Sequence, residues 1–359
     1  MPHNVLLRRY ICRRLSDYFS QPAHKVVGSI GTSCSWSTET EGVSHRPNIP
    51  FSSLMGEWHW KQTYKRLYNE QNGQWLTPSE LFTPHYSNIM ANFISTSMST
   101  NQFSNGNDVG FEIVELGGGR GTNAKALLDH LKNHHNGMYE RLEHYTIYDT
   151  SGSLHDLQRE VLINASTHAD KVKLVHVDMM DIAEGTSTFL TPSDTPTAVI
   201  SLELLDNLPH DKVARCVETH DILQAEVVPL DSTSDVVDLN TQHPYMEVFS
   251  PLSDPLLERI VSMAPSLYTP TISHGPRWIP SVACGVLMKL FECRPNSSIA
   301  FADFDWLPAP DLTNFSLSDA TILAEPAVGD PLVTDMDGRD YPCYLTPSPD
   351  VLCDILFPT

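Results

Sequence analysis

The sequence has no long hydrophobic run and few basic residues. No stretch approaches the roughly 18 uninterrupted apolar residues that a membrane-spanning helix needs, so we expect no membrane span. Lys and Arg number 23 against 44 Asp and Glu, which gives a formal net charge of -21. A surface this acidic repels phosphate backbones, so we expect no nucleic-acid partner. The charge favours a basic partner, such as an arginine-bearing protein segment, although solubility alone also accounts for it.

Paired cysteines are also missing. The 7 cysteines are scattered along the chain, and none forms a Cys-x-x-Cys pair. The sequence therefore predicts neither a disulfide framework nor a zinc site, and buried thiols in a reducing compartment fit best. His130 and His134 have a spacing that a metal can use on a helix. No zinc motif accompanies them, so we expect a solvated helix face and no metal.

The first 48 residues differ in character from the rest. Residues 1–25 interleave basic and apolar side chains at helical spacing, with Asp17 as the single acid. The basic residues are Arg8, Arg9, Arg13, Arg14 and Lys25. Such a segment is typical of mitochondrial transit peptides, and residues 28–48, rich in Ser, Thr and Gly, suit a cleavage zone or linker. We therefore predict a transit peptide and linker over 1–48 and a location in the mitochondrial matrix. An ordinary basic N-terminal helix is the alternative.

The following two regions differ in their expected secondary structure. Residues 49–105 are expected to form an N-terminal helical region. Residues 106–210 alternate strand and helix patterns, and the expected strands are 111–116, 145–148, 172–177 and 198–202. We expect Thr122 to cap the first helix of this region. The succession predicts an α/β, Rossmann-like doubly wound parallel sheet that binds its ligand at the carboxyl ends of the strands.

Residues 211–359 are expected to form an α+β substrate-side region, inserted or C-terminal, that completes the sheet. The expected strands are 213–229, 245–249 and 299–302, and the expected helices are 254–263 and 281–292. The chain ends directly after an apparent strand, as a truncated sequence would.

A glycine-rich loop between the first strand and the first helix of the core carries the main functional signal. The dinucleotide fingerprint G-x-G-x-x-G fails because its last position is Thr122, and no Gly-Lys-Ser/Thr of a phosphate loop follows. The pattern E-x-G-x-G-x-G fits instead. Its residues are Glu115, Gly117, Gly119 and Gly121. In methyltransferases this turn lets the backbone pass close to the methionine portion of S-adenosylmethionine, where a Cβ would collide. The loop, with Thr122, therefore predicts an S-adenosylmethionine site.

Two acids accompany this loop. Asp149 ends the second expected strand, where a carboxylate can accept both ribose hydroxyls. Asp178 follows the third strand and is a candidate for the adenine amino group. For Asp149, the alternative is an acid stabilised by a helix N-terminus.

Two further acids follow the fourth expected strand. Glu203 and Asp206 lie three residues apart on one turn, at the strand end that faces the cofactor. Paired carboxylates can clamp a guanidinium through charge-assisted hydrogen bonds and orient its nitrogen toward a methyl donor. Methyl transfer needs little acid–base chemistry beyond that positioning. We therefore predict Glu203 and Asp206 as catalytic and substrate-binding residues, with two acids on a solvated turn as the alternative.

These segments together resemble the MidA-like methyltransferase family. The matching residues are Glu115–Thr122, Tyr145–Ser151, Glu203–Pro209 and Thr77-Pro78-Ser79-Glu80. The resemblance covers roughly residues 60–359, and the C-terminal part looks like fungal or plant-type members. It implies a Rossmann-like fold, S-adenosylmethionine as donor, a protein arginine as acceptor, and Glu80 as a substrate-binding residue. Mitochondrial members include a protein arginine methyltransferase that assists assembly of respiratory complex I, so symmetric dimethylation of a complex I subunit is implied.

This sequence departs from the family pattern at three places. Gly118 replaces a proline, Leu202 replaces an asparagine, and the central pair of Thr77–Glu80 is transposed. Cofactor binding is expected to survive these changes, whereas catalytic competence is in question. The leading hypothesis is a mitochondrial protein arginine methyltransferase. The alternatives are a non-catalytic assembly factor that keeps the fold, and a methyltransferase that acts on RNA or a small molecule; the acidity argues against RNA.

Overall fold

The computed structural model describes residues 4–26, 55–59, 62, 77–99, 109–187, 189–229, 245–268, 275–303, 307, 309–313, 323–327 and 329–358. Within these ranges the strands form three sheets, and no helix is long and apolar enough to cross a membrane. Much of the expected helical region 49–105 lies outside the described residues. Two helices are described in its C-terminal half, α4 (Pro78–Leu81) and α5 (His85–Ser99).

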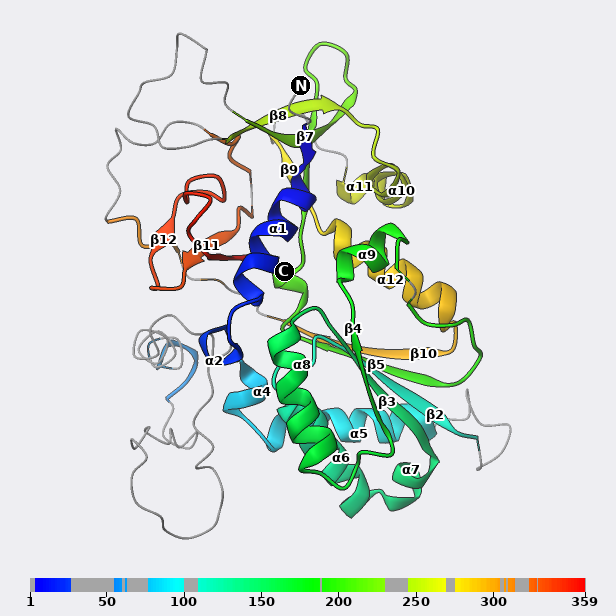
Figure 1. Ribbon diagram of the computed structural model, residues 1–359. Helices are drawn as coiled ribbons and strands as arrows, with labels where there is room; N and C mark the ends of the chain where they lie inside the picture. The colour runs from blue at the N-terminus through cyan, green and yellow to red at the C-terminus, as the bar shows by residue number, and fades with distance from the viewer. Residues whose placement is uncertain are drawn as a thin grey trace.

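A parallel five-stranded sheet of order β10-β5-β2-β3-β4 forms the centre of the molecule (Figure 1). Its strands are β2 (Phe111–Leu116), β3 (Leu142–Asp149), β4 (Val172–His176), β5 (Thr197–Leu202) and β10 (Ser297–Ala302). The central strands β2 and β5 are buried almost throughout, as parallel strands covered on both faces should be. After β2 the chain extends the sheet on one side through β3 and β4, and then returns to add β5 on the other side. The carboxyl ends of β2 and β5 therefore form a topological switch point, where open α/β sheets bind ligands.

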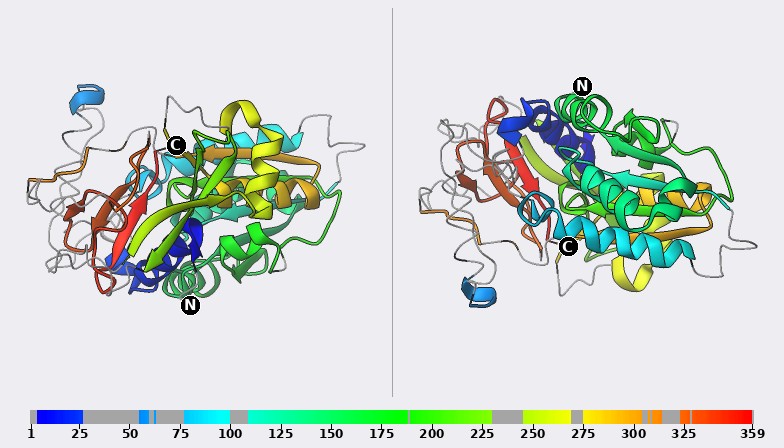
Figure 2. Two further views of the ribbon diagram at one scale, coloured as in Figure 1. Left: turned by 90° about the horizontal axis from the view of Figure 1, so that it is seen from above. Right: turned by 90° about the horizontal axis from the view of Figure 1, so that it is seen from below.

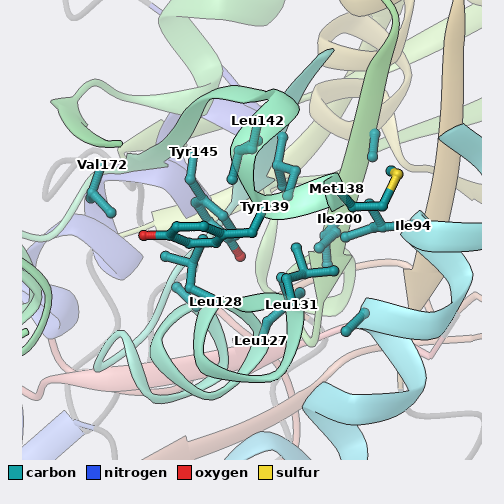
Figure 3. Packing of buried hydrophobic residues seen from close by; sticks show 14 of the residues in the cluster. Ile94, Leu127, Leu128, Leu131, Met138, Tyr139, Leu142, Tyr145, Val172 and Ile200 are labelled. Carbon is teal, nitrogen blue, oxygen red and sulfur yellow. The ribbon is translucent and has the colours of Figure 1, made fainter. Parts of the chain in front are cut away.

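Helices cover both faces of this sheet. One apolar cluster joins it to α5, α6 (Thr122–His134) and α7 (Asn136–Arg141). Figure 3 shows Leu127, Leu128 and Leu131 of α6 packed against Tyr139 and Tyr145. A second cluster joins the sheet to α9 (Met179–Glu184) and α12 (Ser281–Cys293). The result is the three-layered Rossmann-like fold that the sequence predicts.

The remaining strands form two antiparallel sheets. The larger has the order β1-β7-β6-β9, with β8 paired to β7, and α10 (Pro255–Met263) and α11 (Pro265–Tyr268) follow β8. Its strands are β1 (Val5–Leu6), β6 (Asp211–Arg215), β7 (Ile222–Pro229), β8 (Tyr245–Pro251) and β9 (Arg277–Ile279). The smaller sheet has the order β12-β11-β13, with strands β11 (Leu332–Asp335), β12 (Asp340–Tyr341) and β13 (Cys353–Leu356). Both sheets come from the region that the sequence predicts as α+β.

The N-terminal helix α1 (Leu7–Phe19) packs as part of the fold, beside the C-terminal strands (Figures 1 and 2). Its apolar stripe of Leu7, Ile11 and Leu15 is buried in a cluster with side chains of β7, β11 and β13. The guanidinium of Arg8 is buried too, and it forms salt bridges of 2.7–2.9 Å with Glu184, Asp211 and Asp254. The transit peptide over 1–48 stays a prediction. Cleavage of this segment would remove the apolar contacts of α1 and the salt bridges of Arg8.

The other expected strands and helices of residues 106–302 are present with ends shifted by a few residues, but the expected strand 213–229 is wrong. A turn interrupts this stretch, which forms the two strands β6 and β7, and these pair antiparallel. One capping residue is predicted wrongly. The N-cap of α6 is Gly121, in the left-handed region with φ 82°, and Thr122 is the first helical residue. Ser151 caps α8 (Gly152–Arg159), where its side chain accepts a hydrogen bond from the Leu154 N–H. A π-helix, η2 (Glu160–Asn164), continues α8.

Candidate functional site

A cavity lies at the carboxyl ends of β2, β3, β4 and β5, at the switch point of the central sheet. Its wall includes the loop that follows β2, the ends of the next three strands, and parts of α1, α2, α4 and β13. Of the predicted site residues, eight line it: Glu80, Glu115, Gly117, Gly119, Thr122, Asp149, Asp178 and Glu203. Gly121 and Asp206 are not among the lining residues.

Three glycines of the loop after β2 have left-handed backbone conformations. Gly117, Gly119 and Gly121 have φ values of 72°, 51° and 82°, a region that residues with a Cβ adopt only under strain. A Cβ on Gly119 would meet no atom within 4 Å and would point into open space. Gly119 thus leaves room at the cavity wall for a ligand to approach the backbone. A Cβ on Gly121 would instead lie 3.2 Å from Leu162 Cδ1, so this glycine serves packing.

Gly118 stands where the family pattern has a proline, and its surroundings explain the replacement. A Cβ at this position would lie 2.4 Å from Cγ2 of Ile147, on the neighbouring strand β3. A proline here would collide with that side chain. Gly118 and Ile147 therefore fit each other, and the glycine keeps the loop in contact with the sheet.

Glu115, at the start of the loop, is held by hydrogen bonds of its buried side chain. Its carboxylate accepts hydrogen bonds from Asn123 Nδ2 at 2.8 Å and from the Tyr145 hydroxyl at 2.9 Å. Burial raises the pKa of Glu115 to about 7, against the effect of these two hydrogen bonds. Asn123 lines the cavity, and its buried Oδ1 has no hydrogen-bond partner within the protein. A buried polar atom at a cavity wall is an acceptor site for a ligand.

Asp149 is buried at the end of β3, where the sequence predicts a ribose ligand. Its Oδ1 accepts the Ser151 N–H at 3.0 Å, and its Oδ2 accepts Gln158 Nε2 at 2.9 Å. Burial raises the pKa of Asp149, while these hydrogen bonds lower it. The carboxylate has four lone pairs and also accepts the Gly118 N–H, so it retains capacity for a further donor from the cavity.

Asp178 has a role in the fold as well as a place in the cavity wall. Its Oδ1 accepts the Met180 N–H at 2.8 Å and so caps α9. Its Oδ2 lies 3.6 Å from the Cys12 thiol of α1, which also lines the cavity. The Asp178 side chain therefore links α1 to the N-terminus of α9 at the cavity wall.

The short helix α4 places a further acid, Glu80, beside the glycine loop. Thr77 caps this helix by accepting the Glu80 N–H at 3.4 Å. Burial raises the pKa of Glu80, whereas a hydrogen bond from Thr122 and the charge of Arg120 lower it. Glu80 is thus held against the glycine loop, and the structure places it beside the predicted cofactor residues.

Glu203 lies at the end of β5 in a strained backbone conformation, with φ 55°. Non-glycine residues in this region are concentrated at functional sites. Its Oε1 accepts the Ser79 N–H of α4 at 3.3 Å, while its buried Oε2 has no partner within the protein. Burial, supplemented by the charges of Asp303 and Glu80, raises the pKa of Glu203 to about 8. Glu203 therefore contributes to the cavity wall a poorly solvated carboxyl, one oxygen of which has no hydrogen-bond partner within the protein.

Asp206 lies on the short 3-10 turn η3 (Leu205–Asn207) and is fully buried. Its Oδ1 accepts Asn207 Nδ2 at 2.9 Å. Burial, and then the charges of Asp303 and Asp354, raise its pKa well above the ordinary value. The sequence predicts Asp206 on the substrate side, and the structure places its side chain behind the cavity wall.

Sequence analysis misses two groups of lining residues. Asp354 of β13 lines the cavity, as do Cys12, Leu15, Ser16 and Phe19 of α1. Two hydrogen bonds fasten the end of α1 to this region, from Ser151 Oγ to the Phe19 carbonyl and from Ser153 Oγ to the Gln21 carbonyl, both 2.9 Å. No local motif marks these residues, because they lie far along the chain from the glycine loop.

The ionisable side chains of the cavity wall are almost all acidic. Six acids line it, namely Glu80, Glu115, Asp149, Asp178, Glu203 and Asp354. Among the described lining residues Arg120 is the single basic side chain, and its charge acts on Glu80. A wall of this composition suits ligands that carry positive charge.

Comparisons with known proteins agree with this geometry. A family model described as "Putative S-adenosyl-L-methionine-dependent methyltransferase" matches residues 91–331. No curated protein matches the chain. One similar crystal structure is that of a COG1565 superfamily member from Burkholderia thailandensis, described as a "likely methyl transferase" and bound to S-adenosyl-homocysteine. Its TM-score is 0.56 and its sequence identity is 16%, and the match covers 98% of this chain and 68% of that chain. A native structure of an uncharacterized protein from the same organism and superfamily has a TM-score of 0.51 and 16% identity, with 98% and 67% covered.

At this level of identity the two structures show a shared fold, and the family model, which matches more than half of the chain, shows the family. The cofactor is S-adenosylmethionine, and the residues present fit it: Gly119 leaves the backbone open, Asn123 offers a free acceptor, and the acidic wall suits a cation. The chain belongs to the MidA-like family of S-adenosylmethionine-dependent methyltransferases.

Proposed function

We propose that this methyltransferase acts on an arginine nitrogen of a protein substrate. The observation that carries the proposal is the acidic wall, in which the carboxyl of Glu203 holds one oxygen without a partner. A guanidinium is a planar cation with donors that match carboxylate oxygens. An arginine side chain is also long enough to enter a cavity while the protein that bears it stays outside.

When bound, S-adenosylmethionine supplies a methyl group attached to a positively charged sulfur. We propose that Asp149 holds the ribose hydroxyls and that the loop of Gly117 and Gly119 lies along the methionine part. Glu203 orients the acceptor nitrogen through its free Oε2 and takes up the proton that this nitrogen releases as its bond to carbon forms. Its raised pKa, about 8, makes the ionised carboxylate a stronger base than an ordinary glutamate, and the ionised fraction that can accept the proton grows as the pH rises toward 8.

The finer parts of the proposal rest on the family resemblance. It implies symmetric dimethylation of a complex I subunit in the mitochondrial matrix, and thereby support of complex I assembly. The net charge of -21 supports a basic protein partner over a nucleic acid.

The test is turnover on protein arginine. The purified protein would be incubated with methyl-labelled S-adenosylmethionine and a mitochondrial extract from cells that lack it, and the proteins would then be hydrolysed to amino acids. We expect label in methylarginine, a large loss of it with Glu203→Gln, and no change with Glu140→Gln, an exposed acid on α7. Label in another amino acid or in a small molecule would refute the arginine assignment.

A non-catalytic assembly factor is the second candidate, and Leu202 is the observation that favours it. This residue lines the cavity where the family has an asparagine, so an apolar side chain replaces a polar group next to Glu203. Calorimetry with S-adenosylhomocysteine, run beside the turnover assay, separates the two candidates. Cofactor binding without turnover on any protein would favour the scaffold.

A further inference from the structure

The N-terminal helix α1 has a second face besides the apolar stripe that is buried against β7, β11 and β13. This second face lines the cavity at the carboxyl ends of the central strands, and it consists of Cys12, Leu15, Ser16 and Phe19. The four residues follow the spacing i, i+3, i+4, i+7, which places them on one side of a helix. Two successive turns of α1 therefore form part of the cavity wall. We call these four residues the cavity face of α1.

Two contacts place the cavity face beside the two acids that the sequence predicts for the cofactor. At one end, the Cys12 thiol lies 3.6 Å from Asp178 Oδ2. At the other end, the Phe19 carbonyl accepts a hydrogen bond of 2.9 Å from Ser151 Oγ, and the N–H of the same serine donates to Asp149. Cys12 and Phe19 are two helical turns apart, about 10 Å. The helix therefore passes along the cavity wall from the end of β4 to the end of β3.

The wall beside these contacts is largely apolar. Leu15 and Phe19 line it from α1, and Leu154 and Met179 line it from the starts of α8 and α9. Burial raises the pKa of Cys12 to about 12, so its thiol is protonated at neutral pH and adds a small, weakly polar group. Apolar side chains with a few polar groups among them are the usual surroundings of a bound aromatic ring.

We propose that the cavity face of α1 binds the adenosine part of S-adenosylmethionine, with Leu15 and Phe19 as apolar contacts of the adenine. This inference rests on the proposed ribose site at Asp149. The contacts of α1 with Ser151 and Asp178 hold the helix against the two strand ends at which the adenosine binds. The N-terminal segment is thus a part of the cofactor site as well as of the fold. Loss of residues 1–26 would remove this part of the site.

The experiment compares Ser16→Trp with Asp17→Trp in the full chain. Both native side chains are exposed, and Ser16 lines the cavity whereas Asp17 is not among the lining residues. The probes are S-adenosylhomocysteine and 5'-methylthioadenosine, which has the adenosine part without the amino acid. In calorimetry, Ser16→Trp should weaken the binding of both probes at least tenfold, because the indole takes the space of the adenosine. Asp17→Trp should keep both wild-type Kd values.

Alkylation of Cys12 tests the same contact in the wild-type protein, without a substitution. The thiols would be labelled with N-ethylmaleimide, and the labelled peptides would be measured by mass spectrometry with and without each probe. Either probe at saturation should slow the labelling of Cys12 at least tenfold. The labelling of Cys216, which is not among the lining residues, should not change.

The outcomes separate this inference from the proposed ribose site. If wild type does not bind methylthioadenosine, the ribose site at Asp149 and the role of α1 both fail. If wild type binds both probes and Ser16→Trp keeps both Kd values, only the role of α1 fails. A loss of S-adenosylhomocysteine binding alone would assign α1 to the amino-acid part and would also overturn this role. If Ser16→Trp unfolds at lower urea than wild type, the labelling decides, and an unchanged rate at Cys12 overturns the role of α1.

Discussion

Replacing Glu203 by glutamine should stabilise the folded protein while it removes activity. The carboxyl is part of the cavity wall, where one oxygen has no partner and burial disfavours ionisation. Glutamine has nearly the same shape, keeps an oxygen that can accept the Ser79 N–H, and carries no charge. The substitution therefore removes the free-energy cost of ionising a buried carboxyl and changes few other contacts.

The magnitude follows from the pKa of Glu203, which is about 8 in the folded protein against an ordinary value of 4.5. A group with a raised pKa binds its proton more tightly in the folded than in the unfolded chain. Its contribution to stability is therefore greatest below pH 4.5 and is lost as the pH rises toward 8. Each pH unit between two pKa values corresponds to about 1.4 kcal/mol, so between pH 5 and pH 8 the loss is on the order of 3 kcal/mol.

Urea unfolding at pH 5 and pH 8 measures this contribution. Wild type contains other acids with raised pKa values, so the relevant quantity is its difference from Glu203→Gln at each pH. We expect the variant to gain stability over wild type by about 3 kcal/mol more at pH 8 than at pH 5. The exposed acid variant Glu140→Gln should show no such difference. A Glu203→Gln variant with the pH dependence of wild type would refute the account of this carboxyl.

Three further outcomes are expected. Gly119→Ala should weaken S-adenosylhomocysteine binding at least tenfold in calorimetry, because a Cβ at this lining residue would take up open space beside the loop backbone and its φ of 51° strains a residue with a Cβ. An unchanged Kd would contradict the position of the loop. Arg8→Met should lower the free energy of unfolding in urea by about 3–5 kcal/mol, because it leaves buried carboxylates without their cation. Arg9→Met changes an exposed side chain with one ion pair, and it should lower the free energy of unfolding by less than about 1 kcal/mol. Equal effects of the two arginine variants would contradict the anchoring of α1. Arginine-peptide binding should tighten as the pH rises through about 8, where Glu203 ionises, and should lose that dependence in Glu203→Gln; a retained dependence would assign the titration to another group.

Local patterns predict the central sheet well. β2 has the bounds that its apolar run indicates, and the glycine-rich segment forms the turn between β2 and α6, with three positive φ values. These features depend on residues close together in the chain. Thr122 shows the limit of such arguments, because a glycine in the left-handed region supplies the cap of α6 without a side chain.

The N-terminal helix shows a different limit. A basic amphipathic pattern is shared by transit peptides and by a helix whose apolar stripe enters a core. The structure places the stripe of α1 in a core and pairs Arg8 with three acids that lie at least 176 residues away. Such long-range partners leave no mark on the local pattern.

The turn after β5 shows the same limit. A spacing of three residues puts Glu203 and Asp206 on one turn, but it does not fix which side chain faces the cavity. The structure turns Asp206 into the interior and brings Asp354 to the wall through the pairing of β13 with β11. The sheet that delivers this residue consists of short strands in a proline-rich tail, where periodicity carries little information.

The central claim is that this protein methylates arginine in a protein partner, and mass spectrometry of arginine methylation tests it most directly. Mitochondrial proteins would be compared between cells with the protein, cells without it, and cells in which Glu203→Gln replaces it. The account predicts at least one arginine that is methylated with the wild-type protein and unmethylated in the other two. Identical arginine methylation in all three would contradict it.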